Sequence, residues 1–263
     1  MGTRALDLDQ WLVVDRQRRA DLNYRAQLLA RVRPMVFAAK PHSEAAAAEL
    51  LAITRAWLLD HDIAPALPFG DEHPVIEAAR LVQEDLVILQ RIDDAWVLTA
   101  GVVCFPTHWS IADKIGLPLD GIHAPVAHYE AELRERVDRF HDRLTVQRPV
   151  WRRNWFVLPT DELHLRSYGG QMHTATSIAA DGTPMWIRSE RQTLRRLPKS
   201  DAIVFTIRVQ LQSLGVLRDR PDIAGKMLAS VRSWDHDKRM YTSTGGAIDE
   251  LIDWLSTVST GGA

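Results

Sequence analysis

Residues 202–211 have the sequence AIVFTIRVQL, and this stretch gives the clearest indication of the fold. Apolar side chains stand at every second position from Ile203 to Leu211, with Thr206, Arg208 and Gln210 between them. A period of two is the pattern of a β-strand that buries one face. Residues 184–194 form a second candidate strand just before it. The short connection between the two predicts neighbouring strands.

Three further segments have the β-branched composition of strands. Residues 85–90 (DLVILQ) and residues 96–105 (WVLTAGVVCF) are separated by the turn-like pair Asp93-Asp94, so we expect them to form a hairpin. Residues 155–158 form the fifth candidate strand. The spacing of all five favours an antiparallel sheet.

Helical patterns flank these strands. Within residues 16–33, apolar side chains recur at helical spacing at Leu22, Ala26, Leu29 and Val32. Ser43 is placed to cap an alanine-rich helix over residues 44–59. Further helices are expected over residues 75–82, 126–144, 220–231 and 248–255. The prediction is an α+β fold with a five-stranded antiparallel sheet and flanking helices. A single domain over residues 1–263 would hold a helical segment over about 1–84 and closing helices over about 220–257.

Composition excludes several classes of protein. Lys and Arg number 32 and Asp and Glu number 34, so the formal net charge is -2 and no strongly basic field would attract a nucleic acid. The single cysteine, Cys104, excludes an internal disulfide framework and is predicted to be a small core residue. No apolar run is long enough to span a membrane and no signal segment is visible, so we expect a cytoplasmic protein. The sequence contains no G-x-G-x-x-G motif, which argues against an internal dinucleotide-binding domain.

A long predicted loop, residues 106–126, carries His108, Trp109 and His123. Loops of this length without secondary structure usually have a functional use. Ile122, Pro125 and Val126 give His123 an apolar setting, which favours the neutral imidazole that a metal binds. From the residues alone, both a satisfied core histidine and a metal ligand remain open.

A second group of candidates is charged. Strand alternation over residues 186–192 places Trp186, Arg188, Glu190 and Gln192 on one face, and Arg191 on the other. A buried charge needs a partner, so one reading is an internal Arg–Glu network that holds the sheet. The other is an arginine set that binds cofactor carboxylates, with Glu190 facing an amine.

These segments together resemble the haem-dependent oxidative N-demethylase-like family. The resemblance rests on W-x4-K-x-G-x2-L-x2-I-H-x-P-V over residues 109–126, on Arg153-Asn154-Trp155, and on R-x-E-R-Q-T-L-x-R-L-P over residues 188–198. Residues 202–208 and the opening residues 6–15 fit as well. The long Arg-Gln-Thr-Leu motif is the most specific of them.

The resemblance implies a PAS-like sheet that binds haem b and oxidises a small amine or another nitrogen-containing metabolite. His123 matches the motif histidine and would be the iron ligand, with His108 as the alternative. Arg153, Arg188, Arg191 and Arg208 would hold the haem propionates, because a guanidinium matches a carboxylate. Glu190 would hold a protonated amine. O2 would be the oxidant, and electrons would come from a separate flavin and iron–sulfur reductase.

Two other classes of function stay open at the level of sequence. One is a non-catalytic haem-based gas sensor or carrier, because a fold alone does not decide function. The other is a haem-free protein that binds an acidic metabolite through its Arg/Glu face. Replacing His123 with Ala would weaken haem binding under the first two readings and change no spectrum under the third. The oligomeric state, a homo-oligomer included, also stays open.

Overall fold

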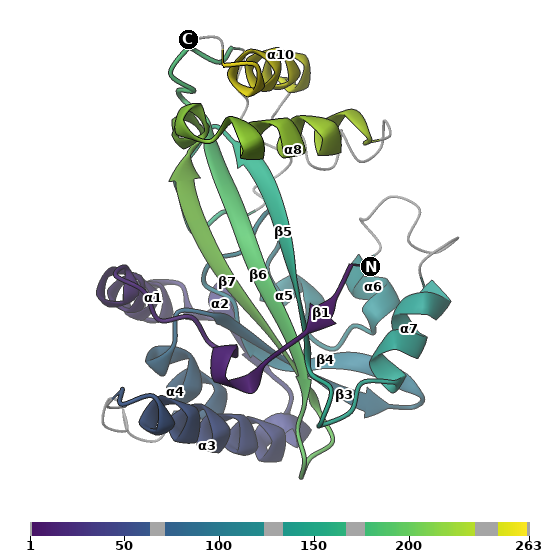
Figure 1. Cartoon of the computed structure of the whole chain (residues 1–263). Helices are drawn as coiled ribbons and strands as arrows, with labels where there is room; N and C mark the ends of the chain where they lie inside the picture. The colour runs from purple at the N-terminus through teal and green to yellow at the C-terminus, as the bar shows by residue number, and fades with distance from the viewer. Residues whose placement is uncertain (1, 64–71, 124–133, 167–176, 235–246, 262–263) are drawn as a thin grey trace. The chain divides into compact units, whose positions relative to one another are not determined.

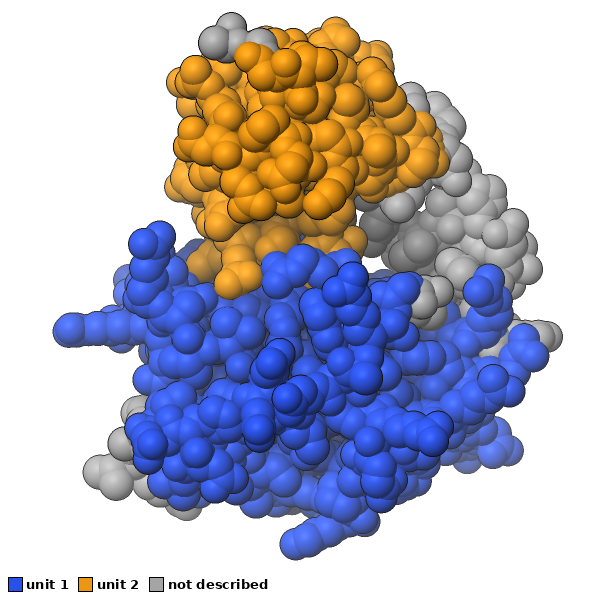
Figure 2. Space-filling view, viewed as in Figure 1, with its two compact units in different colours: residues 1–153, 164–166, 191–208 blue, residues 154–163, 167–190, 209–263 orange. Residues whose placement is uncertain are grey.

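The computed structural model describes residues 2–63, 72–123, 134–166, 177–234 and 247–261. The chain divides into two compact units, coloured separately in Figure 2. Unit 1 comprises Met1–Arg153, His164–Arg166 and Arg191–Arg208, and unit 2 comprises Asn154–Leu163, Ser167–Glu190 and Val209–Ala263. A single domain over residues 1–263 therefore stays a prediction, and each unit is described separately below.

The sheet is antiparallel, as predicted, but it has seven strands rather than five, in the order β1-β5-β6-β7-β3-β4-β2 (Figure 1). The five expected strands are all present: β3 (Asp85–Ile92), β4 (Ala95–Val102), β5 (Val150–Leu158), β6 (Trp186–Arg196) and β7 (Ile203–Ser213). The two missed strands are β1 (Arg4–Ala5) and β2 (Phe37–Ala39). They are too short to show the alternating pattern of a strand. They form by antiparallel pairing, β1 with β5 and β2 with β4.

The predicted hairpin of β3 and β4 is confirmed. Leu86 pairs with Val102 and Ile92 with Ala95 across the two strands. Asp93 and Asp94 have φ angles of 46° and 61°, the left-handed conformation that a tight hairpin turn requires at both central residues.

Both faces of the sheet are covered in unit 1. On one face, Val87, Leu89, Ile203 and Phe205 pack in a cluster with side chains of α5 (Ile111–Lys114), α6 (Leu119–His123) and α7 (Arg134–Asp142). Alternation turns Leu86 and Ile88 to the other face, where they have 0% exposure. On that side, α4 (Pro74–Leu81) contacts β3 and β4 and also packs against α1 (Arg18–Arg31) and α3 (Glu44–Asp60). The near-continuous apolar run of β3 reflects this burial on two sides.

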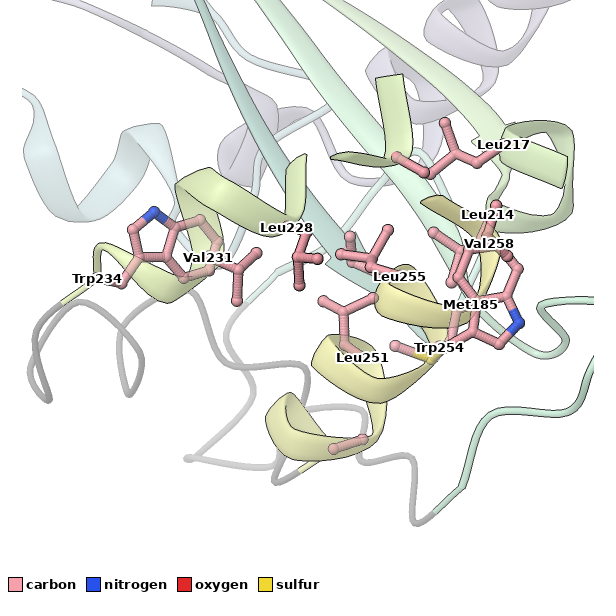
Figure 3. Close-up of a cluster of buried hydrophobic side chains, with 13 residues drawn as sticks. Met185, Leu214, Leu217, Leu228, Val231, Trp234, Leu251, Trp254, Leu255 and Val258 are labelled. Carbon is pink, nitrogen blue, oxygen red and sulfur yellow. The ribbon is translucent and has the colours of Figure 1, made fainter. Parts of the chain in front are cut away.

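Unit 2 has its own apolar core. The helices α8 (Pro221–Arg232) and α10 (Ile248–Ser259) lie side by side (Figure 1), and their apolar side chains point toward one another in Figure 3. Leu228 and Val231 of α8 join Leu251 and Leu255 of α10 in this cluster, with Val157 of β5. The 3-10 helix η4 (Leu214–Asp219) adds Leu214 and Leu217.

Two local predictions were wrong. The side chain of Ser43 does not cap α3; its Oγ donates to the carbonyl oxygen of Lys40 at 2.7 Å, within the 3-10 helix η2 (Pro41–Ser43). The segment after β4 is not a structureless loop, because it contains the short helices α5 and α6. A further short helix, α2 (Arg33–Val36), leads into β2, and η1 (Leu8–Gln10) follows β1. None of the helices in the described part of the chain is long and apolar enough to span a membrane.

Candidate functional site

Unit 1 contains a buried charged network around Arg208 of β7. One terminal nitrogen, Nη2, lies 2.8 Å from an oxygen of Asp15 and 2.9 Å from an oxygen of Asp21. Gln83 joins the same two carboxylates through its amide, at 3.0 and 2.7 Å. Arg208 is 2% exposed and Asp21 6%. The Gln83 and Arg208 contacts hold the pKa of Asp15 below its ordinary value against the opposing effect of burial. The predicted propionate partner Arg208 therefore has a structural role in binding two carboxylates of its own chain.

A second buried ion pair fixes the turn that follows β4. Nη1 of Arg25 lies 3.1 Å from Oδ1 of Asp85, and both side chains are at most 1% exposed. The two oxygens of Asp85 also accept from the backbone N–H groups of Cys104 and Phe105, at 2.9 and 2.8 Å. Cys104 is 0% exposed, which confirms that it is a core residue. Burial raises the pKa of its thiol to about 12, so it stays protonated and unreactive.

Glu84 and Arg191 hold the N-terminal segment against the sheet. Oε1 of Glu84 accepts from the backbone N–H of Val13 at 2.7 Å, and burial raises the pKa of this carboxyl above its ordinary value. Arg191 donates to the carbonyl oxygens of Gln10 and Trp11, and its guanidinium stands over the ring of Trp151, 5.5 Å from the centroid. The propionate role of Arg191 stays a prediction, since its described donors bind backbone oxygens.

An open groove of about 460 Å³ runs beside this segment in unit 1. Its lining includes Leu12, Val13, Trp57, His61 and Arg191. The Trp57 and His61 rings stack with centroids 3.8 Å apart, and they bind the carbonyl oxygens of Leu8 and Asp9. The polar groups of Trp57 and His61 thus bind the backbone of the N-terminal segment, and we interpret the groove as part of the packing of that segment.

Arg188 and Glu190 belong to unit 2. Arg188 is 0% exposed and donates to the carbonyl oxygens of Glu162 and Leu163, at 3.1 and 3.0 Å. Glu190 is 7% exposed. Their positions two residues apart on β6 put both side chains on the same side of the strand, as predicted.

The remaining predicted residues lie in unit 1. Arg153 of β5 is exposed. His123 is the last residue of α6, and its side chain lies outside the described residues. His108 is half-buried with a φ of 60°, the left-handed region that few non-glycine residues adopt. The structure thus places His123, Arg153, Arg191 and Arg208 in one unit, and Arg188 and Glu190 in the other.

The sequence prediction missed the contacts of three polar residues: Asp85, Glu84 and His164. Asp85 and Glu84 precede a buried strand, and three consecutive polar residues at 83–85 beside an apolar run were a usable signal. His164 stands in a polar segment with no pattern of its own. Its position beside the turn at Cys104 depends on a bridge between Thr107 and Leu165, which are distant in sequence.

Residues 59–250 match the sequence profile of a family described as haem-dependent oxidative N-demethylase, alpha subunit-like. The match covers nearly three quarters of the chain and includes every predicted site residue. The chain belongs to this family. Membership in the haem-dependent oxidative N-demethylase alpha-subunit-like family implies an oxidative, haem-dependent activity. It confirms the resemblance that the histidine and Arg-Gln-Thr-Leu motifs indicated.

The donor set of unit 1 fits a haem in two respects. α6 ends with an imidazole at His123, next to Ile122, which packs on the buried cluster of that sheet face. Trp109, Ile115 and Phe140 pack on the same cluster and keep part of their apolar surface exposed. Histidine is one of the residues that hold haem iron, and apolar side chains give the porphyrin a surface to pack against. The propionate partners fit less well, because Arg191 and Arg208, like Arg188 of unit 2, already bind oxygens of the protein.

Proposed function

We propose that this family member is a haem-dependent monooxygenase that oxidises a small amine or another nitrogen-containing metabolite, by N-demethylation or a related oxidation. The observation that carries the proposal is the family match over residues 59–250, which contains the motif histidine and the long arginine motif. The proposal includes a PAS-like arrangement of the sheet, haem b as the cofactor, and a separate reductase as the electron donor.

In this proposal His123 would bind the iron of the haem. A bound haem would supply the activation of O2, while the protein supplies orientation and electrostatics. Glu190 would bind the protonated amine, since a carboxylate that is 7% exposed attracts a cation strongly in a low-dielectric setting. Arg188 is buried and lies on the same side of β6 as Glu190, whereas Arg153 of β5 is exposed. Both arginines are proposed to hold haem propionates.

The cofactor is tested by absorption spectra of protein produced with a haem precursor, in oxidised, reduced and carbon monoxide-bound forms. We expect a Soret band that moves on reduction and on carbon monoxide binding, and that is strongly weakened in His123→Ala. The exposed His42→Ala is the matched control and should keep the band. A colourless protein that also fails to bind added hemin would refute the cofactor and favour a haem-free metabolite-binding protein.

The activity is tested by supplying electrons from a competent reductase and a panel of methylamines. Formaldehyde formed in proportion to O2 consumed would support N-demethylation. Glu190→Gln should raise KM for a cationic amine much more than for a neutral nitrogen compound, because it removes the charge and keeps the shape. A haem protein that binds carbon monoxide but turns over none of the panel would favour the sensor or carrier reading.

A further inference from the structure

Three neighbouring strands bring arginines to the ring of Trp151 in unit 1. In the sheet order, β5 lies between β1 and β6. Arg4 of β1 is the antiparallel partner of Trp151 of β5, so their side chains lie on the same side of the sheet. The guanidinium carbon of Arg4 lies 5.7 Å from the centroid of the Trp151 ring, and that of Arg191 of β6 lies 5.5 Å from it. One indole ring therefore contacts two cations.

A third arginine lies close to this pair. Arg153 follows Trp151 by two residues on β5, so alternation puts both side chains on one side of the strand. Burial is the main cause of the lowered pKa of Arg191; the charge of Glu84 opposes it, and the positive charge of Arg153 lowers the pKa further. Arg4 and Arg153 are exposed, whereas Arg191 is 8% exposed. We call Arg4, Arg153 and Arg191 the arginine cluster.

The described contacts of Arg4 and Arg191 supply little negative charge. Arg191 donates to the carbonyl oxygens of Gln10 and Trp11, which are uncharged, and Arg4 contacts the indole ring. Glu84 is the carboxyl that acts on Arg191, but burial raises the pKa of Glu84, which favours its uncharged form. Positive charges held close together repel one another, and an anion bound among them would remove this repulsion.

The cluster is also oriented before any ligand binds. The face of an aromatic ring attracts a cation within about 6 Å of its centroid, so Trp151 holds two guanidiniums without neutralising them. Arg4 is placed by the pairing of β1 with β5, which the N–H of Leu6 extends by donating to the carbonyl of Pro149 at 2.9 Å. Less side-chain freedom is then lost on binding. The planar guanidinium matches the oxygens of a carboxylate or a phosphate.

We propose that Arg4, Arg153 and Arg191 form a binding site around Trp151 for an oxyanion, that is, for a carboxylate or phosphate group of a ligand. The site is formed by the protein without haem, so the proposal does not rest on the proposed function. Arg4 also lies outside residues 59–250, which match the family profile. The complete site is therefore not a consequence of family membership.

The test is a titration of the apoprotein with inorganic phosphate, and separately with citrate, by isothermal titration calorimetry at low ionic strength, because salt screens exposed charges. We expect saturable binding that Arg4→Gln and Arg153→Gln each weaken by about ten- to a hundredfold, the range for a lost hydrogen bond to a charged group. Arg31→Gln, at the exposed end of α1, is the matched control and should keep the wild-type affinity. All three arginines are exposed, so the variants should fold, which equal thermal midpoints would show.

Two results would overturn the proposal. The first is a wild-type apoprotein that shows no saturable binding of phosphate or citrate. The second is an equal loss of affinity in Arg4→Gln, Arg153→Gln and Arg31→Gln, because that pattern indicates a general attraction of anions to positive charge rather than a site.

The haem-loaded protein distinguishes two sources of the oxyanion. Val150 packs on the buried cluster beside α6, so alternation points Trp151 and Arg153 to the other side of β5. Phosphate binding by both the apoprotein and the haem-loaded protein would support a site for a free oxyanion. Binding that is lost on haem loading would support a site that a haem propionate fills, the role proposed above for Arg153. A protein that binds phosphate but no hemin would support the site and refute the haem function.

Discussion

Replacing Asp85 with Asn should destabilise unit 1 more than any surface substitution. Asp85 is 0% exposed and serves three partners: the guanidinium of Arg25 and the N–H groups of Cys104 and Phe105. Asn has almost the same shape but one acceptor oxygen instead of two. The substitution therefore leaves Arg25 as a buried charge without its counter-ion and turns an amide N–H toward a backbone N–H.

The expected cost follows from these contacts. Removing one partner of a buried ion pair costs about 3–5 kcal/mol, because the remaining charge stays desolvated. Native domains have a total unfolding free energy of about 5–15 kcal/mol, so the loss is a large share of the whole. The exposed Asp94→Asn is the matched control. Its carboxylate is 3.8 Å from Arg91 and fully exposed, and such pairs contribute about 0–1 kcal/mol.

Two measurements check this prediction. Urea unfolding followed by tryptophan fluorescence gives the change in stability. The rate of thiol labelling reports local opening of the turn, because Cys104 is the single cysteine of the chain and is fully buried. We expect a lower urea midpoint and faster labelling in Asp85→Asn than in Asp94→Asn. If the unfolding free energy of Asp85→Asn lies within about 1 kcal/mol of the wild-type value, the reasoning is refuted, because the expected loss is about 3–5 kcal/mol.

Three further predictions concern single residues. Burial raises the pKa of Glu84 above its ordinary value of 4.5, so the folded chain keeps a proton that the unfolded chain releases as the pH rises. Between the pKa of Glu84 in the unfolded chain and its higher pKa in the folded chain, the unfolding free energy of the wild type should fall relative to that of Glu84→Gln by about 1.4 kcal/mol per pH unit. Unfolding free energies of the two proteins that stay parallel from pH 4 to 8 would contradict this. Glu49→Ala should cost about 2–4 kcal/mol, because the Glu49 carboxylate accepts from the N–H groups of Lys199 and Ser200 at 2.8 and 2.7 Å; hydrogen exchange of these two amides should accelerate with it. Arg208→Met should lower the unfolding free energy by about 3–5 kcal/mol, because it leaves Asp15 and Asp21 without their cation. A lower haem affinity with an unchanged unfolding free energy of the apoprotein would instead indicate a propionate role for Arg208.

Local sequence determined the long elements. Alternation over residues 203–211 predicted β7, and the Asp-Asp pair predicted the turn after β3, because side chains on a strand point to opposite faces. Helical spacing likewise predicted α1, and alanine-rich composition predicted α3. Helices at α4, α8 and α10 were also expected from the sequence. The histidine and arginine motifs were enough to identify the family, because they are long and occur in a fixed order.

Tertiary structure decided the rest, because the energies involved come from partners that are distant in sequence. β1 and β2 exist only through pairing with β5 and β4. The contacts of Arg191 and Arg208 depend on an N-terminal segment 180 to 193 residues away, which supplies the oxygens that bind them. The contact of His164 Nδ1 with the Cys104 carbonyl likewise joins residues 60 positions apart in the chain. A sequence states which side chains are charged, but burial and the choice of partner are properties of the folded chain.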